Sequence, residues 1–159
     1  MELFLVQHAE AKSKSEDPER PLTDAGVEMA RRMAAWASQT GLSVAQIRHS
    51  GKRRAEQTAE ILGEHLKPPA GVIAVDGLGP NDDVQSVATA LTGETGPLML
   101  VGHLPFMSRL VGLLVVNEPD AVVVRFRNAG IVCLRQQESR WAVDWALPPD
   151  LVASSASPH

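Results

Sequence analysis

The chain has 159 residues, of which 44% are apolar and 21% are charged, and its formal net charge is −4. This length suits one globular domain, and the acidic balance argues against a general nucleic-acid binder, which needs a basic face to neutralise phosphates. A small anionic ligand is not excluded, because a local group of arginines can outweigh a mildly acidic surface.

Cysteine content and hydropathy bear on the compartment. Cys133 is the only cysteine of the sequence, so no intramolecular disulfide is possible, which fits a reducing compartment. The chain does not start with a basic stretch followed by an apolar one, as a secretory signal does. No apolar run approaches the roughly 20 residues of a membrane span. We expect a cytoplasmic protein without a membrane segment.

The N-terminal segment predicts a strand, a loop and a helix. The apolar run at residues 3–6 has no polar face and predicts a buried strand. The polar residues 8–22 include two prolines and predict a loop. Thr23 and Asp24 suit a helix N-terminus, and apolar residues then recur at helical spacing up to Gly41, which can end the helix.

The next segment repeats the alternation of strands and helices. Residues 44–49 are a weaker strand candidate, and Ser50 is expected to cap a helix over 52–66, which Pro68 and Pro69 stop. A third strand is expected at 71–75. A loop rich in glycine, proline and acidic residues then leads to a short helix at 83–91.

The second half opens with another buried strand and then changes character. Residues 98–101 are a strong buried strand candidate and precede Gly102 and His103, and an apolar helix is expected at 105–116, with proline in its first turn. Strands separated by turns follow, at 122–124, 131–134 and 141–146. Trp141 and Trp145 in the last of them are expected to pack in the core or along the hairpin.

These elements predict an α/β fold, a three-layer α/β/α sandwich. Strands alternate with helices up to about residue 116 and then give way to hairpins. The central sheet is therefore expected to be mostly parallel, with antiparallel C-terminal strands. We expect a single domain over residues 1–150, followed by a flexible Ser/Ala/Pro-rich tail at 151–159.

Two histidines occupy equivalent places. His8 and His103 each follow a strongly apolar strand, and ligands of open α/β sheets bind outside the carboxyl ends of the strands. Adjacent strands lie about 4.8 Å apart, so both rings can reach one phosphoryl group if their strands are neighbours. A single histidine after a strand is more often an ordinary polar loop residue, and His49, His65 and His159 are interpreted as structural or solvated.

A basic segment opens the helix that follows the second strand. Helix N-termini favour anions through free N–H groups and a partial positive charge, and an arginine such as Arg54 adds a planar fork for two phosphate oxygens. The alternative is a solvated basic turn made of Lys52, Arg53 and Arg54.

Four segments in order resemble the histidine phosphatase superfamily, whose fold is phosphoglycerate mutase-like. The resemblance covers about residues 2–148, and the sequence is most similar to the SixA-type phosphohistidine phosphatases, including the final hairpin with Trp145. The segments that carry it are Val6-Gln7-His8-Ala9, Arg20-Pro21-Leu22-Thr23-Asp24-Ala25-Gly26, Arg54-Ala55-Glu56-Gln57-Thr58-Ala59 and Gly102-His103-Leu104-Pro105.

The resemblance implies a phosphate pocket made of arginines and histidines. It makes His8 a nucleophile that becomes transiently phosphorylated, Arg54 a clamp on the phosphoryl oxygens, and His103 the donor of a hydrogen bond or positive charge. Neutral imidazole, with an ordinary pKa of about 6.5, is a good nucleophile near neutral pH. No metal or other cofactor is expected, because cationic side chains can stabilise the charge on the phosphoryl oxygens.

Two residues depart from the superfamily pattern. Gln7 stands where the family has arginine, which keeps N–H donors but loses charge and fork geometry. One lost charged hydrogen bond of about 1.5–3 kcal/mol slows a reaction by roughly 10–100-fold. Arg20, Lys12 and Arg53 are candidate replacement cations, and we include Gln7 and Arg20 among the expected phosphate-binding residues. Ala9 replaces a glycine, which narrows the pocket or changes the backbone if that glycine has positive φ.

The general acid has two open interpretations. Asp83 matches the SixA-type aspartate and is the candidate acid, although it suits the cap of the following helix equally well. Phosphohistidine needs little acid catalysis because its P–N bond is labile, whereas an alkoxide leaving group must be protonated. Glu10 either orients a histidine or arginine or is a solvated loop carboxylate.

We therefore predict a metal-independent phosphatase acting on phosphohistidine in a protein of the phosphorelay type. The short loops offer no lid for a small substrate, so an open pocket suits a side chain presented by another protein. The alternatives are a phosphomonoesterase for a small metabolite, and a weakly active or non-catalytic phosphate-binding module, which Gln7 favours. A metal site is disfavoured by the spacing of His8 and His103.

Overall fold

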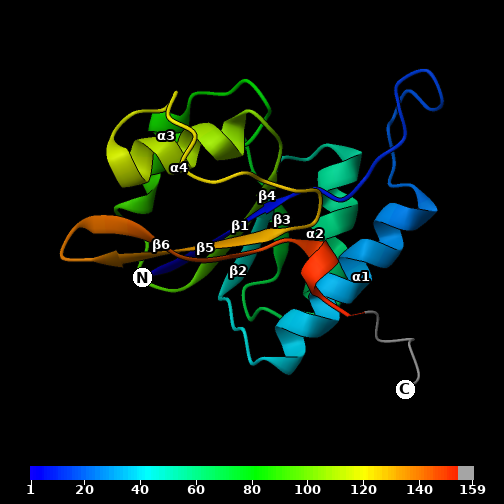
Figure 1. The fold of residues 1–159 in the computed structure, drawn as a ribbon, viewed down its shortest axis with the longest axis horizontal. Coiled ribbons are helices and arrows are strands. Elements are labelled where there is room, and N and C mark those ends of the chain that lie inside the picture. Colours follow the sequence, from blue (N-terminus) through cyan, green and yellow to red (C-terminus); the bar gives the residue numbers. More distant parts are fainter. Residues whose placement is uncertain (154–159) are drawn as a thin grey trace.

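A six-stranded sheet in the order β3-β2-β4-β1-β5-β6 forms the centre of the molecule, in a computed structural model that describes residues 1–153 (Figure 1). The strands from β3 to β1 run parallel, β5 is antiparallel to β1, and β6 is antiparallel to β5. The predicted sheet, mostly parallel with antiparallel C-terminal strands, is confirmed. The strands are β1 Glu2–Gln7, β2 Gln46–His49, β3 Val72–Ala74, β4 Leu98–Gly102, β5 Ile131–Gln137 and β6 Arg140–Leu147.

Helices cover both faces of this sheet, which confirms the three-layer sandwich. Alternate residues of β1 point to opposite faces: Phe4 packs in the core under α1 and α2, and Leu5 packs in the core under α3 and α4. This is why β1 is apolar throughout rather than alternating. The helices are α1 Asp24–Gln39, α2 Arg53–Leu66, α3 Val84–Leu91 and α4 Phe106–Val116.

The register between β1 and β4 determines where the two candidate histidines meet. Gln7 pairs with Gly102 at the carboxyl ends of the two parallel strands. The backbone N–H of His8 continues the pairing and donates to the Gly102 carbonyl at 3.0 Å. His8 and His103 therefore leave the sheet side by side, although 95 positions of sequence separate them.

Of the two predicted helix caps in the first half, one is confirmed and one is wrong. Thr23 is the N-cap of α1, and its hydroxyl accepts from the Gly26 N–H at 3.0 Å. Ser50 is not the cap of α2, because the helix begins two residues further on, with Lys52 at the cap position and no side-chain cap bond. The Ser50 hydroxyl instead lies 2.6 Å from a ring nitrogen of His103.

The strand predicted at 122–124 is absent from the structure. These residues lie in irregular backbone between α4 and β5. Val122 is exposed, while Val123 and Val124 pack against the core under α3 and α4. Because β1 and β6 occupy both edges of β5, no partner edge is left there, and the valines contribute burial without strand pairing.

The end of the described chain packs against the domain. Pro149–Leu151 form a 3₁₀ turn (η1), and Val152 packs against the core under α1 and α2. The flexible tail was predicted at 151–159, and its residues 154–159, with His159, lie outside the described residues. Within residues 1–153 no helix is long and apolar enough to cross a membrane.

Candidate active site

Two imidazole rings face each other at the carboxyl edge of the sheet. The ring centroids of His8 and His103 lie 5.1 Å apart, with 54° between the ring planes. The two residues are only 9% and 2% exposed. The structure thus brings together the two histidines that the sequence singled out, in a nearly buried setting.

The ring of His8 is fixed in one orientation and one tautomer. Its Nδ1 lies 2.7 Å from the Ala9 carbonyl oxygen. A carbonyl only accepts hydrogen bonds, so Nδ1 carries the proton and Nε2 keeps the free lone pair. The Asn128 side-chain amide donates to the His8 carbonyl at 2.9 Å and secures the backbone from the other side. Nε2 has no hydrogen-bond partner among residues 1–153.

Ala9 ties this loop to helix α2. Its N–H donates to the Thr58 hydroxyl at 3.0 Å, and that hydroxyl donates to the Arg54 carbonyl at 2.8 Å. Ala9 is fully buried and does not adopt a positive φ. The methyl group in place of the family glycine therefore requires no left-handed backbone here.

His103 is buried as a neutral ring. Its Nε2 lies 2.6 Å from the Ser50 hydroxyl, and its Nδ1 is buried without a partner. Burial, followed by the nearby charge of Arg54 and weaker effects of His8, Lys52 and Arg20, lowers the pKa of His103 to about 3. In the absence of an anion, His103 thus acts as a hydrogen-bonding group rather than a cation.

Two arginines supply positive charge beside the histidines. Arg54 lies in the first turn of α2 with its Nε buried and unpartnered. Arg20 has a φ of +50°, donates from Nε to the Lys12 carbonyl at 3.0 Å, and lines the same hollow of about 540 Å³ as Arg54. Burial, opposed by the hydrogen bond to Ala9, lowers the pKa of His8, and both arginines lower it further. His8 is therefore neutral at pH 7.

Gln7 ends β1 directly before His8. Its side-chain Oε1 is buried without a hydrogen-bond partner. The residue that replaces the family arginine therefore lies at the same end of the sheet as His8 and His103, but it brings no charge.

Asp83 and Glu10, the two carboxylates that the sequence offered for a catalytic or orienting role, both form hydrogen bonds at helix N-termini. The Asp83 side chain caps α3 by accepting from the Gln85 N–H at 3.0 Å, in agreement with the alternative interpretation. Glu10 accepts from the Thr23 hydroxyl at 2.7 Å at the start of α1. The hollow beside Ser50 is lined by Asp76 and Asp82, not by Asp83.

Sequence reasoning missed the residues that hold the site in place. Ser50, Thr58 and Asn128 each contact a site residue from a position far along the chain. Serine, threonine and asparagine are common in caps and turns, so no local pattern distinguishes these three. Only the Thr58 position within the resemblance to the family offered a signal.

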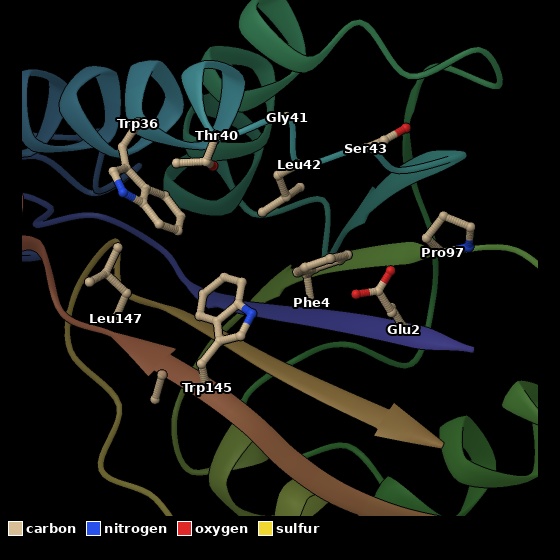
Figure 2. A pocket seen from close by; sticks show the side chains of 11 residues that line it. Glu2, Phe4, Trp36, Thr40, Gly41, Leu42, Ser43, Pro97, Trp145 and Leu147 are labelled. Carbon is tan, nitrogen blue, oxygen red and sulfur yellow. The ribbon is translucent and has the colours of Figure 1, made fainter. Parts of the chain in front are cut away.

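A second hollow lies at the opposite end of β1 and carries different chemistry. Trp36, Trp145 and Phe4 border a cavity of about 580 Å³ together with Glu2 (Figure 2). The Trp36 and Trp145 rings meet edge to face at 5.6 Å, which confirms the packing role predicted for Trp145. No histidine or arginine lines this cavity.

One group of possible metal ligands occurs in the described chain, and it does not fit a metal. Glu2, Cys133 and Asp144 lie close together at the sheet end that borders the aromatic cavity. The Arg135 guanidinium already bridges both carboxylates, at 3.0 and 3.2 Å. Burial also raises the pKa of the Cys133 thiol to about 11, which disfavours the thiolate that binds metals.

Known proteins resemble this chain in sequence and architecture. Residues 3–79 match the model of the histidine phosphatase superfamily, branch 1. The phosphohistidine phosphatase SixA of Escherichia coli is 30% identical over 155 residues, which cover 94% of each chain. A solved structure of the protein histidine phosphatase SixA complexed with tungstate superimposes with a TM-score of 0.83 at 27% identity, covering 95% of this chain and 99% of the other.

The same fold also occurs with other activities. A phosphoserine phosphatase from Entamoeba histolytica, solved with 3-phosphoglyceric acid, has a TM-score of 0.70 at 16% identity, covering 92% of this chain and 96% of that one. At this identity the likeness concerns the fold alone, and the substrate must be argued from the site.

Proposed function

This chain belongs to the histidine phosphatase superfamily and is of the SixA type, and from this premise we propose that it hydrolyses phosphohistidine on a protein through a phosphorylated His8. The observation that carries the proposal is the fixed His8 ring. Its Nδ1 proton is held by the Ala9 carbonyl at 2.7 Å, which leaves the Nε2 lone pair free beside His103. A neutral imidazole in this tautomer is ready to attack phosphorus.

The reaction proceeds in two displacements. The Nε2 lone pair of His8 forms a bond to phosphorus while the P–N bond of the substrate breaks. The bonding electrons go to the departing imidazole nitrogen, which takes up a proton from solvent. A water molecule then attacks the phosphorus of phosphorylated His8, which releases inorganic phosphate and a proton and restores the neutral ring.

The surrounding residues position and stabilise the phosphoryl group. Phosphoryl transfer depends mainly on alignment and on charge stabilisation over the equatorial oxygens. Arg54 and Arg20 supply cations, and Gln7 supplies an amide donor. His103 supplies a hydrogen bond, and a bound phosphoryl dianion raises its low pKa and favours its protonated form. This set of donors requires no metal.

The acid chemistry favours phosphohistidine over an alkyl phosphate. Asp83, the candidate acid, is engaged in capping α3. A phosphoserine or a sugar phosphate needs a proton on the departing oxygen, whereas the imidazole of phosphohistidine departs with less help. A small-metabolite phosphomonoesterase is the second candidate, and an inactive phosphate-binding module is the third, because Gln7 lacks the family charge.

The proposal is tested by comparing substrates with a chelator present. We expect turnover of a histidine-phosphorylated protein and slower turnover of an aryl phosphate in EDTA, with both activities lost in His8→Ala. Rapid acid quenching traps an acid-labile phosphoryl group on the wild-type protein. His65→Gln, at a half-buried position in the last turn of α2 away from the site, is the matched control and keeps full activity.

Three outcomes contradict the proposal. A requirement for a divalent metal excludes the metal-independent mechanism. Phosphate binding without turnover supports the binding module. A preference for small phosphate esters over the phosphorylated protein supports the phosphomonoesterase.

A further inference from the structure

A group of exposed cations borders the opening above Arg20 and Arg54. Lys14, Lys52 and Arg53 line the same hollow as the two site arginines, and we name these three residues the basic rim. The hollow contains five cations against two carboxylates, although the whole chain is acidic, with a net charge of −4. Positive charge is therefore concentrated around the two arginines that the proposed function assigns to the phosphoryl group.

The charges of the basic rim are largely unpaired. Among residues 1–153, Arg53 forms an ion pair with Glu56 at 2.8 Å, whereas Lys14 and Lys52 form none. All three are exposed, while His8 and His103 are 9% and 2% exposed. A phosphoryl group at His8 lies deep in the site, so the rim remains available to groups that surround the phosphorylated residue.

The other side of the opening has the opposite character. The adjoining hollow of about 520 Å³ shares Gly51 and Lys52 with the first but is lined by Asp76 and Asp82. Both aspartates are exposed. An acidic partner is attracted over the start of α2 and repelled over the 76–82 loop, so the charges also determine its orientation.

We propose that the basic rim docks acidic side chains that flank the phosphohistidine of a substrate protein. This inference rests on the proposed function and specifies its partner, which is a phosphorylated protein with a carboxylate-rich surface on one side of the histidine. Exposed charge pairs are individually weak and screened by salt. The rim therefore acts mainly on association and on the choice of partner.

The test uses histidine peptides of equal length flanked by glutamates, serines or lysines, phosphorylated with phosphoramidate, with N-phosphoimidazole as the small substrate. For the wild-type chain at low salt we expect kcat/KM to be about fivefold higher for the glutamate peptide than for the serine peptide, since two exposed pairs contribute that much. The lysine peptide falls below the serine peptide. These differences shrink at 0.5 M salt.

A double variant separates the contribution of the basic rim from that of the site arginines. Lys14→Glu with Arg53→Glu removes or reverses the preference for the glutamate peptide and leaves N-phosphoimidazole turnover within about twofold. Lys52 is left unchanged in this variant, because its charge also lowers the pKa of His103. Lys67→Glu is the control for the reversal at Arg53: it makes the same charge change as that single substitution at the far end of α2, about 20 Å away at 1.5 Å per residue, and retains the wild-type preference.

Two outcomes overturn the inference while leaving the proposed function intact. One is equal kcat/KM for the three peptides with normal N-phosphoimidazole turnover. The other is an equal loss on peptides and N-phosphoimidazole in the rim variant, which would assign these cations to the phosphoryl group itself.

Binding of the unphosphorylated peptides, followed by fluorescence anisotropy, keeps the test independent of turnover. If no phosphohistidine is hydrolysed, the proposed function fails. The docking inference then stands or falls on whether the wild-type chain, but not the rim variant, binds the glutamate peptide more tightly than the lysine peptide.

Discussion

The two ends of strand β1 have surroundings of opposite chemistry. At its start, Glu2 and Phe4 border the aromatic cavity with Trp36 and Trp145 (Figure 2). At its end, Gln7 leads into His8, where cations and hydrogen-bonding rings gather. The aromatic end is the more apolar of the two, yet the groups to which we assign the reaction lie at the polar end.

The difference shows which features identify a reactive site in this fold. In the aromatic cavity, the charged Glu2 is already paired with Arg135. At the other end, ring and guanidinium nitrogens of His103 and Arg54 are buried without partners. Buried unpaired polar groups cost free energy, and in the proposed function a bound phosphoryl group compensates that cost. Within the described chain, three of the four buried side-chain atoms without a partner belong to Gln7, Arg54 and His103 at this end, and the fourth belongs to Arg32 of α1.

The largest expected effect is at the polar end. Arg54→Ala removes the guanidinium to which we assign the stabilisation of the phosphoryl oxygens, and we expect kcat to fall by roughly 100–1,000-fold, as for the loss of one preorganised donor. The free energy of unfolding should change little, because Arg54 forms no ion pair within the described chain. Steady-state kinetics and urea unfolding measure both quantities, and activity within tenfold of wild type would remove Arg54 from the mechanism.

The converse effect is expected at the aromatic end. Trp145 is half-buried against Phe4 and Trp36, so Trp145→Ala should lower the free energy of unfolding by about 2 kcal/mol, less than the 3–5 kcal/mol of a fully buried aromatic. For the Trp145→Ala protein that remains folded, kcat should stay within about twofold of the wild-type value. Trp141→Ala, on the other face of the hairpin, is the control. A large fall in kcat for Trp145→Ala but not for Trp141→Ala would show that the aromatic end and the histidine end of β1 are coupled.

Restoring the arginine that the family has at position 7 should increase the positive charge at the histidine end of β1 and leave the aromatic end unchanged. Gln7→Arg adds a guanidinium beside His8, and we expect kcat/KM to rise by about tenfold, the value of one charged hydrogen bond in the transition state. Gln7→Lys adds the charge without the fork and should give a smaller rise. A sharp fall in activity would show instead that Gln7 is specifically required.

The last expected effect is the dependence of stability on pH. The pKa of His103 is lowered to about 3 and that of His8 is also lowered, so the unfolded chain binds protons below pH 6.5 that the folded chain does not. The free energy of unfolding should therefore decrease as pH falls from 6.5 towards 4, by at most about 1.4 kcal/mol per pH unit for each histidine. Urea unfolding of wild type and His103→Gln at pH 7.5 and 5 measures this. An unchanged slope in the variant would contradict the buried neutral state of His103.

Much of the fold could be predicted because its signals are local. The apolar run before His8 predicts β1, and Thr23 predicts the start of α1, since a buried strand and a helix cap depend on neighbouring residues. The sequence failed where the local signal was ambiguous. The valines at 122–124 favour a strand, but β5, the next strand along the chain, is already paired on both sides. Ser50 has the side chain of a cap but lies two positions too early.

By itself the sequence determined which elements form and which residues end them, because hydrophobic periodicity and caps act over a few residues. It also placed His8, Arg54 and His103 at the ends of those elements. Only the tertiary structure decided that β1 and β4 are neighbours in a register that sets the two rings 5.1 Å apart. It alone assigned Ser50 to His103, because such a partner is selected by packing between distant segments, and it decided between the two interpretations of Asp83 in favour of the helix cap.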